Sequence, residues 1–212
     1  MKNYLKALLG ALTITAFTVS SAYAGMGVSL MYGKVETDGT ETERTVSGVT
    51  SETNSASKSE NYIGGSIFAE TEYAGLTLGL DVVPFKIKLG DGKRTDTTSD
   101  GNETTQEDGT VTAEANLDYL TTIYAHYPIG DWYAGLGYHM TKVSTDETLH
   151  TSSYGDENIN GLQYAIGRNA GSLRYELSYS DFDDISLTST NGDKISADAD
   201  NLMFKLSYVL GN

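Results

Sequence analysis

Hydrophobic and polar residues alternate in eight separate segments of this 212-residue chain. The clearest example is residues 118–140, DYLTTIYAHYPIGDWYAGLGYHM, where the alternation stops for a few residues and then resumes. A period of two places successive side chains on opposite faces of an extended strand. The pattern therefore predicts eight β-strands, at approximately 25–35, 61–71, 76–89, 113–127, 132–140, 162–166, 173–179 and 202–210.

The links between these segments alternate in length. Three are short and rich in Gly, Pro, Asn or Asp, at about 72–75, 128–131 and 168–171. Such links are typical of tight hairpin turns. The other four are long and crowded with Thr, Ser, Asp, Glu and Gly, at about 37–60, 90–111, 143–158 and 183–198. This order predicts one antiparallel up-and-down sheet with every long polar loop at the same end.

The third segment changes phase at Pro84. Its apolar residues occupy even positions in 76–82 and odd positions in 85–89. Because proline cannot donate a ladder hydrogen bond, we interpret this change as a β-bulge. The bulge would keep the apolar residues on one face and turn Lys86 and Lys88 to the other.

The face opposite the apolar one consists mainly of small residues. Its members are Gly27, Ser29, Gly33, Gly64, Ser66, Thr77, Gly79, Gly135, Gly137, Gly161, Ala165 and Gly167. A water-facing surface usually carries many long charged side chains, whereas the interior of an eight-stranded barrel is only wide enough for side chains to fill it. The small-residue face is therefore expected inside a closed barrel, with the apolar face toward lipid. A soluble calycin-like barrel around an internal ligand is the alternative.

Several charged residues share the expected interior. Buried charges persist only when they are paired and hydrogen-bonded. Parity places Lys88 opposite Glu114 and brings Arg174 and Glu176 close to Lys205. We therefore predict an interior polar network of Lys86, Lys88, Glu114, Asp118, Arg174, Glu176 and Lys205.

Aromatic residues on the apolar face cluster near its two ends. Rings at membrane–water interfaces form girdles around membrane barrels. The predicted interfacial aromatics are Tyr127, Trp132, Tyr175 and Tyr208 at the short-turn end, and Tyr32 and Phe85 at the long-loop end.

The first 24 residues have the composition of a secretory signal peptide. Lys2 and Lys6 precede an apolar run, and Ala22, Tyr23 and Ala24 form an A-x-A cleavage site. We expect a signal peptide at 1–24 and a single barrel domain at 25–212. No later stretch reaches the roughly 18 consecutive apolar residues that a membrane helix needs.

Charge and cysteine content limit the partners and the stabilising bonds. The formal charge is −15, and loss of the two signal-peptide lysines leaves −15 − 2 = −17. Such a chain is a poor ligand for nucleic acid. The chain has no cysteine, so the exported fold must be held without disulfides.

These features resemble those of the small eight-stranded outer-membrane barrels of Gram-negative bacteria, such as the transmembrane domain of outer-membrane protein A and outer-membrane protein X. The stretch YAHYPIGDWYAGLGY and the order of strands carry the resemblance from about residue 25 onward. It implies an outer-membrane location, with the termini and short turns in the periplasm and the long loops outside. One departure is the end FKLSYVLGN, because such barrels usually finish on an aromatic residue.

No residue pattern predicts catalysis, a cofactor or a metal. His126, His139 and His150 do not have the spacing of a metal site. Outer-membrane lipid A deacylases use a His-x-Ser pair, and His150 and Ser152 have that spacing. Because this pair falls in a long predicted loop, a lipid A-modifying enzyme is only an alternative.

The long acidic loops favour a non-catalytic structural or surface-interaction role. We expect the partners to be outer-membrane lipids and lipopolysaccharide, bridged by divalent cations, and an extracellular or phage partner. The chain is expected to be monomeric. A narrow diffusion pore is a further alternative.

Overall fold

The computed structural model describes residues 24–44, 50–96, 109–148, 153–190 and 192–210. They form ten antiparallel strands: β1 (Ala24–Arg44), β2 (Thr50–Tyr73), β3 (Leu76–Val82), β4 (Ile87–Asp96), β5 (Gly109–Ile129), β6 (Trp132–Glu147), β7 (Glu157–Ala170), β8 (Leu173–Phe182), β9 (Ile185–Thr188) and β10 (Lys194–Leu210). Among these residues, no helix is long and apolar enough to cross a membrane.

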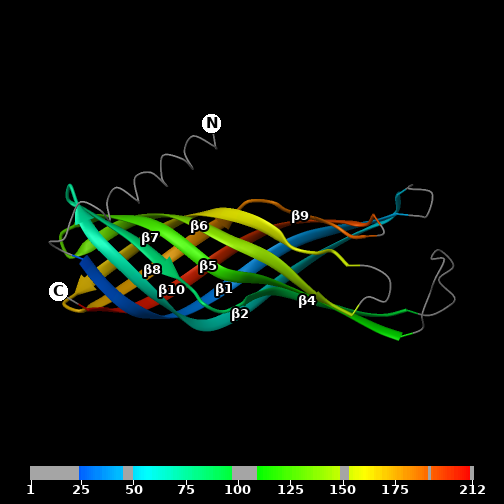
Figure 1. Cartoon of the computed structure of the whole chain (residues 1–212), viewed down its shortest axis with the longest axis horizontal. Helices are drawn as coiled ribbons and strands as arrows, with labels where there is room; N and C mark the ends of the chain where they lie inside the picture. The colour runs from blue at the N-terminus through cyan, green and yellow to red at the C-terminus, as the bar shows by residue number, and fades with distance from the viewer. Residues whose placement is uncertain (1–23, 45–49, 97–108, 149–152, 191, 211–212) are drawn as a thin grey trace.

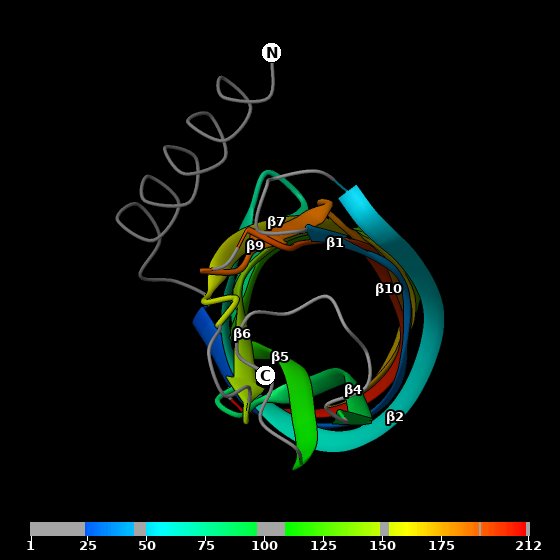
Figure 2. The ribbon, with the colours of Figure 1, turned by 90° about the vertical axis from the view of Figure 1, so that its right-hand side faces the viewer.

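The sheet closes on itself, because β1 pairs with both β2 and β10 (Figure 2). β3 and β4 both pair with β5, and β8 and β9 both pair with β10. The ten strands therefore occupy eight positions around the wall. The predicted eight-stranded antiparallel up-and-down barrel is confirmed. The C-terminal strand ends beside the short turns, at one end of the long axis (Figure 1).

Much of the sequence expected to form long loops is β-strand. β1 continues to Arg44 and β2 begins at Thr50, with a continuous ladder from Ala24↔Thr71 to Glu43↔Glu52. The prediction that 37–60 is a loop is wrong for most of its length. These extensions are rich in Thr, which favours strands. Residues 53–59 of β2 are exposed on both faces, so the hydrophobic alternation that marks a strand is absent there.

Around the short-turn half of the barrel, large apolar side chains point outward. Leu136 is 54% exposed, whereas Arg174 is 7% exposed. On β10 the outward apolar positions run from Leu202 to Leu210. Nine residues at about 3.3 Å each, tilted by roughly 40°, span about 23 Å, close to the apolar band of about 25 Å in membrane barrels. We call this zone the apolar belt.

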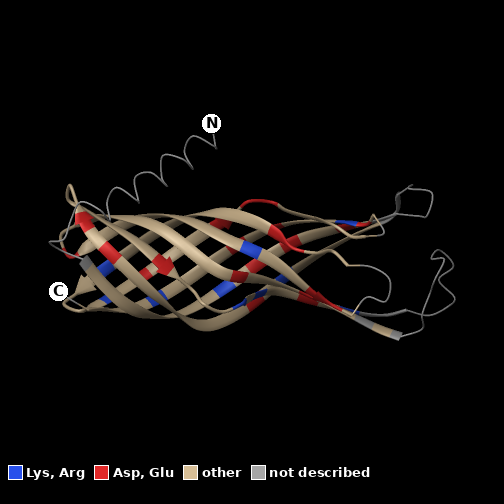
Figure 3. Cartoon of the chain, in the orientation of Figure 1, with Lys and Arg blue, Asp and Glu red and all other residues tan. Residues whose placement is uncertain are grey.

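Beyond the apolar belt, the polarity of the two faces is reversed. The interior there is an apolar core: Met31, Val35, Val83, Ile87, Leu89, Leu117, Leu120, Val143, Ile159, Phe182, Ile185, Leu187, Ala199 and Met203. Charged residues follow the strands toward the end opposite the C-terminus (Figure 3). We call this part of the barrel the head. It has a water-compatible outside and an apolar inside.

The wall of the head consists of two groups of strands. Within the described residues, β2 has no ladder with β4, and β7 has none with β9. One group is β2, β1, β10 and β9, and the other is β4, β5, β6 and β7. β4 lies inside the arc of β2 (Figure 2), and the side chain of Lys58 lies over Gly90. The two groups enclose the apolar core between them.

Candidate functional site

A bidentate ion pair crosses the lumen inside the apolar belt. Arg174 of β8 donates from both terminal nitrogens to the Glu70 carboxylate of β2, each over 2.8 Å. Tyr124 of β5 donates its hydroxyl to the same carboxylate at 2.9 Å. All three side chains are buried. Burial of this charge pair is possible because its oxygens and nitrogens are satisfied.

A second cluster lies beside this pair. The Lys205 ammonium lies 3.0 Å from an Asp81 oxygen and 3.1 Å from a Glu176 oxygen. Tyr133 donates its hydroxyl to Glu176 at 2.7 Å. The ring of His126 stacks on Tyr133 with a centroid separation of 4.1 Å and lies 3.5 Å from Glu176. The lumen is therefore crossed by charges of both signs in direct contact.

Hydrogen-bonded neutral groups fill the next layer of the lumen. His139 is fully buried and contacts the Thr122 hydroxyl at 2.7 Å and the Ser180 hydroxyl at 2.8 Å. Gln163 donates to the Ser178 hydroxyl at 3.1 Å. These contacts hold His139 as a structural residue.

Three of the seven expected network residues, Arg174, Glu176 and Lys205, lie in the lumen. The structure joins Glu176 to Lys205 but pairs Arg174 with Glu70 on the far wall. Sequence reasoning missed Glu70, Asp81, Tyr124, Tyr133 and His126 as members of the network. Glu70 and Asp81 stand at inward parity among small residues, which was the available signal.

The other four expected network residues, Lys86, Lys88, Glu114 and Asp118, lie on the outer face of the head, where Asp118 is nonetheless buried beside Lys86, Lys142 and Ser144. Their prediction as interior residues is wrong. On β4 the buried Ile87 and Leu89 face the apolar core, so the alternating lysines point outward. On β5, Tyr119 has a φ of 48° at a register shift, and this bulge turns Leu117 inward.

The outward lysines of the head are paired with acids. Lys86 donates to Asp146 at 3.0 Å, and Lys88 lies 2.8 Å from Asp91 and 3.7 Å from Glu114. The hydrogen bond to Asp146 raises the pKa of Lys86 above its usual range. These pairs are exposed, so each contributes little to stability.

Five of the six expected interfacial aromatics lie on the outside: Tyr32, Tyr127, Trp132, Tyr175 and Tyr208 are all exposed. Phe85 does not, and its prediction as interfacial is wrong. Its ring packs against the apolar core and lies over Gly64, inside the barrel. Additional exposed rings that were not singled out include Tyr73, Tyr119, Tyr164, Tyr179 and Phe204.

Aromatic rings fill the lumen by lying directly on glycines. A Cβ at Gly79 would stand 2.1 Å from the Tyr124 ring, and one at Gly167 would stand 2.2 Å from the Tyr133 ring. Any larger residue would collide with the ring. The residues on this face are therefore small because rings from neighbouring strands occupy the lumen above them. The same rings leave no room for a continuous water column.

A tyrosine covers the mouth of the apolar core. Tyr154 packs against the core and donates its hydroxyl to Glu41 of β1 at 2.5 Å. Burial, followed by the Glu41 contact, raises the pKa of Tyr154 well above its usual range. The backbone amide of Tyr154 donates to Glu147 at 3.1 Å. This segment therefore links β6 to the opposite wall.

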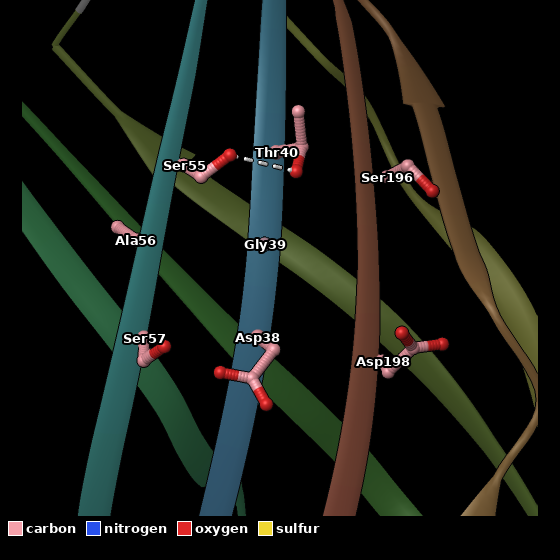
Figure 4. A pocket seen from close by; sticks show the side chains of 8 residues that line it. All are labelled: Asp38, Gly39, Thr40, Ser55, Ala56, Ser57, Ser196 and Asp198. Atoms are coloured by element: carbon pink, nitrogen blue, oxygen red, sulfur yellow. Dashed lines mark hydrogen bonds between the residues drawn. The ribbon is translucent and has the colours of Figure 1, made fainter.

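A shallow groove of about 370 Å³ runs over the outer face of the head (Figure 4). It is lined by Asp38, Gly39, Thr40, Ser55, Ala56, Ser57, Ser196 and Asp198, from three neighbouring strands. A hydrogen bond with Asp184 is the largest cause of a raised pKa at Asp198. In the part of the chain that the structure describes, no three metal-ligating side chains are grouped to hold an ion.

Two predictions concern residues outside the described part of the chain. His150 and Ser152, the pair considered for lipid A chemistry, lie there. So do residues 1–23 of the expected signal peptide, whereas β1 begins at Ala24.

A closed antiparallel wall with an apolar belt outside and a polar network inside defines a transmembrane β-barrel. No hydrogen-bonding edge of the wall faces lipid, because β1 and β10 pair throughout the belt. The protein is an eight-stranded transmembrane β-barrel, the fold that the resemblance predicted.

No protein-family model matches the sequence, and no curated protein matches it. Solved structures that are similar to it include the following three. The attachment invasion locus protein Ail of Yersinia pestis has 12% identity and a TM-score of 0.40, over 89% of this chain and 100% of that chain. The outer membrane protein OprG of Pseudomonas aeruginosa has 13% identity and a TM-score of 0.49, over 88% and 97%. Neisserial surface protein A has 12% identity and a TM-score of 0.41, over 84% and 96%. Because these scores are below 0.5, the class assignment rests on the geometry of the barrel itself.

Proposed function

We propose that this protein is a non-catalytic surface-interaction protein, in which the membrane barrel holds a rigid β-structured head above the outer membrane. One observation carries the proposal. The strands continue well beyond the apolar belt, from Val35 to Arg44 on β1 for example, while the lumen beneath them is filled. A filled barrel with a long external projection presents surface and does not conduct.

The filled lumen argues against the pore alternative. A permeating solute would have to displace the Arg174–Glu70 pair and then cross the apolar core of the head. Breaking a buried pair leaves an uncompensated charge, which is strongly unfavourable. The same side chains occupy the space that a calycin would keep for its ligand.

The described residues offer little support for the enzyme alternative. Of the acids near the His-x-Ser pair, Glu147 accepts the Tyr154 amide and Asp156 pairs with Lys142 at 2.8 Å. Each acid is therefore already engaged by a neighbouring group.

We propose that lipopolysaccharide contacts the head on the side that carries three outward aspartates. Asp38, Asp198 and Asp200 lie on the outer face above the exposed rings of Tyr32 and Phe204. Headgroup phosphates at this height would meet carboxylates, so a divalent cation would have to bridge them. We retain lipopolysaccharide bridged in this way as a proposed partner, beside an extracellular or phage partner.

Shortening one hairpin of the head tests the surface role. Asp38 and Ser57 are paired, so an Asn-Gly turn can replace residues 39–56 and leave the apolar belt intact. We expect the variant to reach the outer membrane and keep heat-modifiable gel mobility. Cells carrying it should lose attachment to cultured epithelial monolayers or susceptibility to a panel of phages.

The matched control changes the opposite end of the barrel. Ala74, in the β2–β3 turn, has a φ of 51°, so Ala74→Gly relieves local strain without touching the head. Unchanged attachment and phage susceptibility in the shortened-hairpin variant, with full surface expression, would reject the surface role.

A further inference from the structure

A single arginine stands on the outer face of the wall at the short-turn end of the apolar belt. On β7, Ile166 is the last apolar outward residue, and Arg168 is the next outward residue. Of the other lysines and arginines in the described ranges, Arg174 and Lys205 face the lumen, and the rest lie at or beyond the long-loop edge of the belt. Within these ranges, the short-turn end therefore carries one outward cation.

Two aromatic residues flank Arg168 on the same outer face. Arg168 pairs with Trp132 of β6 on one side and with Tyr175 of β8 on the other, and both rings are exposed. The Arg168 Cζ atom lies 5.9 Å from the centre of the Trp132 ring. Tryptophan and tyrosine rings at the end of an apolar belt lie at the level of the lipid headgroups. The guanidinium is therefore at the depth of the lipid phosphates.

The guanidinium of Arg168 has unused hydrogen-bond donors. Its anionic neighbour among the described residues is Asp131, whose Oδ2 atom lies 3.7 Å from the Nη2 atom, too far for a hydrogen bond. Both side chains are more than half exposed, so their mutual attraction is weak. The N–H groups of a guanidinium form a planar fork that matches the oxygens of a phosphate. Arg168 is therefore available to a lipid phosphate.

Asp131 adds a negative charge further from the belt. It lies in the β5–β6 turn, one residue before Trp132, whereas Arg168 lies at the level of Trp132 itself. The Asn169 amide donates to the Asp131 carbonyl at 2.8 Å, which joins this turn to the end of β7. A carboxylate in this position accepts hydrogen bonds from an ammonium group. From the belt outward, the wall thus presents apolar side chains, then a cation, then an anion.

From this order we propose that Arg168 and Asp131 bind one phospholipid whose headgroup joins a phosphodiester to a primary ammonium, as in phosphatidylethanolamine. The phosphate contacts Arg168, the ammonium donates to Asp131, and the acyl chains continue over Ile166 and its outward neighbours. The quaternary ammonium of choline has no N–H donor, so the site discriminates against phosphatidylcholine. The site lies at the end of the barrel opposite the head, so this inference is independent of the proposed surface role.

The test uses the fluorescence of Trp132, because this residue is the single tryptophan and lies beside Arg168. The purified protein is reconstituted into vesicles of phosphatidylethanolamine and phosphatidylcholine in equal amounts, with brominated acyl chains on one lipid or on the other. Bromine quenches a tryptophan that it contacts. Each signal is divided by the signal of the same protein in unbrominated vesicles of the same composition, which removes any direct effect of a substitution on the ring.

We expect the quenching to show phosphatidylethanolamine enriched about threefold over phosphatidylcholine beside Trp132, a size typical of exposed charge contacts. Arg168→Gln should abolish this enrichment. Asp131→Asn should also abolish it, and should favour brominated phosphatidylglycerol instead, because the cation is then left without a neighbouring acid. The matched control is Lys34→Gln, which removes an outward cation paired with Glu36 at the other edge of the belt and should leave the enrichment unchanged.

Equal quenching by the two brominated lipids in the unaltered protein would overturn the proposal. So would an enrichment that Arg168→Gln retains, or one that Lys34→Gln removes as completely. Stronger quenching by brominated phosphatidylglycerol than by brominated phosphatidylethanolamine in the unaltered protein would indicate a simple anion site and reject the role of Asp131. Loss of the enrichment on addition of soluble glycerophosphoethanolamine would indicate a site for the free headgroup and reject a lipid as its ligand.

Discussion

The Arg174–Glu70 pair shows what a single buried contact does in this lumen. Among the described residues, each partner is the other's only opposite charge within salt-bridge distance, and Tyr124 donates a further hydrogen bond to the carboxylate. Tyr133 and Phe68 place their rings within 6 Å of the same guanidinium. The pair therefore organises contacts from several strands of the wall.

Removal of one partner should be more damaging than removal of both. Arg174→Met leaves the Glu70 carboxylate buried without its counterion, which costs about 3–5 kcal/mol. The double change Arg174→Met with Glu70→Met should recover a large part of that loss. Chemical unfolding in lipid vesicles, followed by the fluorescence of Trp132, the single tryptophan, measures both.

Replacement of a glycine that lies under an aromatic ring by a larger residue should destabilise the barrel. Gly167→Ala places a Cβ 2.2 Å from the Tyr133 ring, and forced overpacking costs about 1–3 kcal/mol. Gly92→Ala is the control, since nothing stands within 4 Å of its Cβ position. Equal unfolding midpoints for the two variants would show that the ring moves freely.

The Asp198–Asp184 contact gives a pH-dependent signal on the head. The pKa of Asp198 is raised, chiefly by the hydrogen bond with Asp184. An acid whose folded-state pKa is raised favours the folded state below its unfolded pKa and loses that contribution as pH rises through the folded pKa. Asp184→Asn should return the pKa toward its usual range. Carbon-detected NMR titration of the Asp198 carboxyl measures this, and no change would contradict the assigned cause.

At the scale of elements, the sequence predicted the strands and most of their orientation but not the environment of the head. Alternation located the membrane-facing part of every strand, because lipid and lumen differ in polarity there. Odd-numbered residues point inward both before and after Pro84, as the buried side chains of Asp81, Val83, Ile87 and Leu89 show. The apolar residues move to the inner face because the outer face meets water beyond the belt. The inward and outward positions of the strand are not exchanged.

Two features of the elements required tertiary information. The partner of Arg174 lies across the barrel, so it depends on the curvature of the wall. Sequence parity predicts only pairs between adjacent strands and therefore could not identify it. The φ of 48° at Tyr119 occurs in a residue type with no preference for that conformation, so the bulge had no sequence signal.

The overlap of β2 and β4 predicts a specific cross-link. The Cβ positions of residues 58 and 90 are close enough for a disulfide, so Lys58→Cys with Gly90→Cys should oxidise readily in the assembled barrel. Ala56→Cys with Gly90→Cys, displaced by one inward position on β2, should oxidise far more slowly. Non-reducing gel mobility after mild oxidation distinguishes them, and similar rates would contradict the overlap.

At the scale of the whole molecule, two kinds of side-chain packing follow one another along the barrel axis. A charged network occupies the lumen within the belt, and an apolar core occupies the head. Either alone would obstruct an aqueous path, and a barrel of eight strands leaves little room around side chains. Planar-bilayer recordings of purified protein should therefore show no stable stepwise conductance. A sixteen-stranded porin in the same bilayer is the positive control, and large regular steps from this protein would contradict the packing.

The reversal of polarity between belt and head also fixes the depth at which the barrel can rest. A shift outward by a few residues would expose Leu30 and Phe204 to water, and a shift inward would immerse Lys86 and Asp118 in hydrocarbon. Both displacements raise the free energy, so the barrel has one preferred height in the bilayer. Each hairpin of the head must also cross the hydrocarbon before its polar exterior is hydrated, and its return would demand the same crossing. Assembly of this protein is thus expected to be directional and, once the two groups of strands have closed around their core, effectively irreversible.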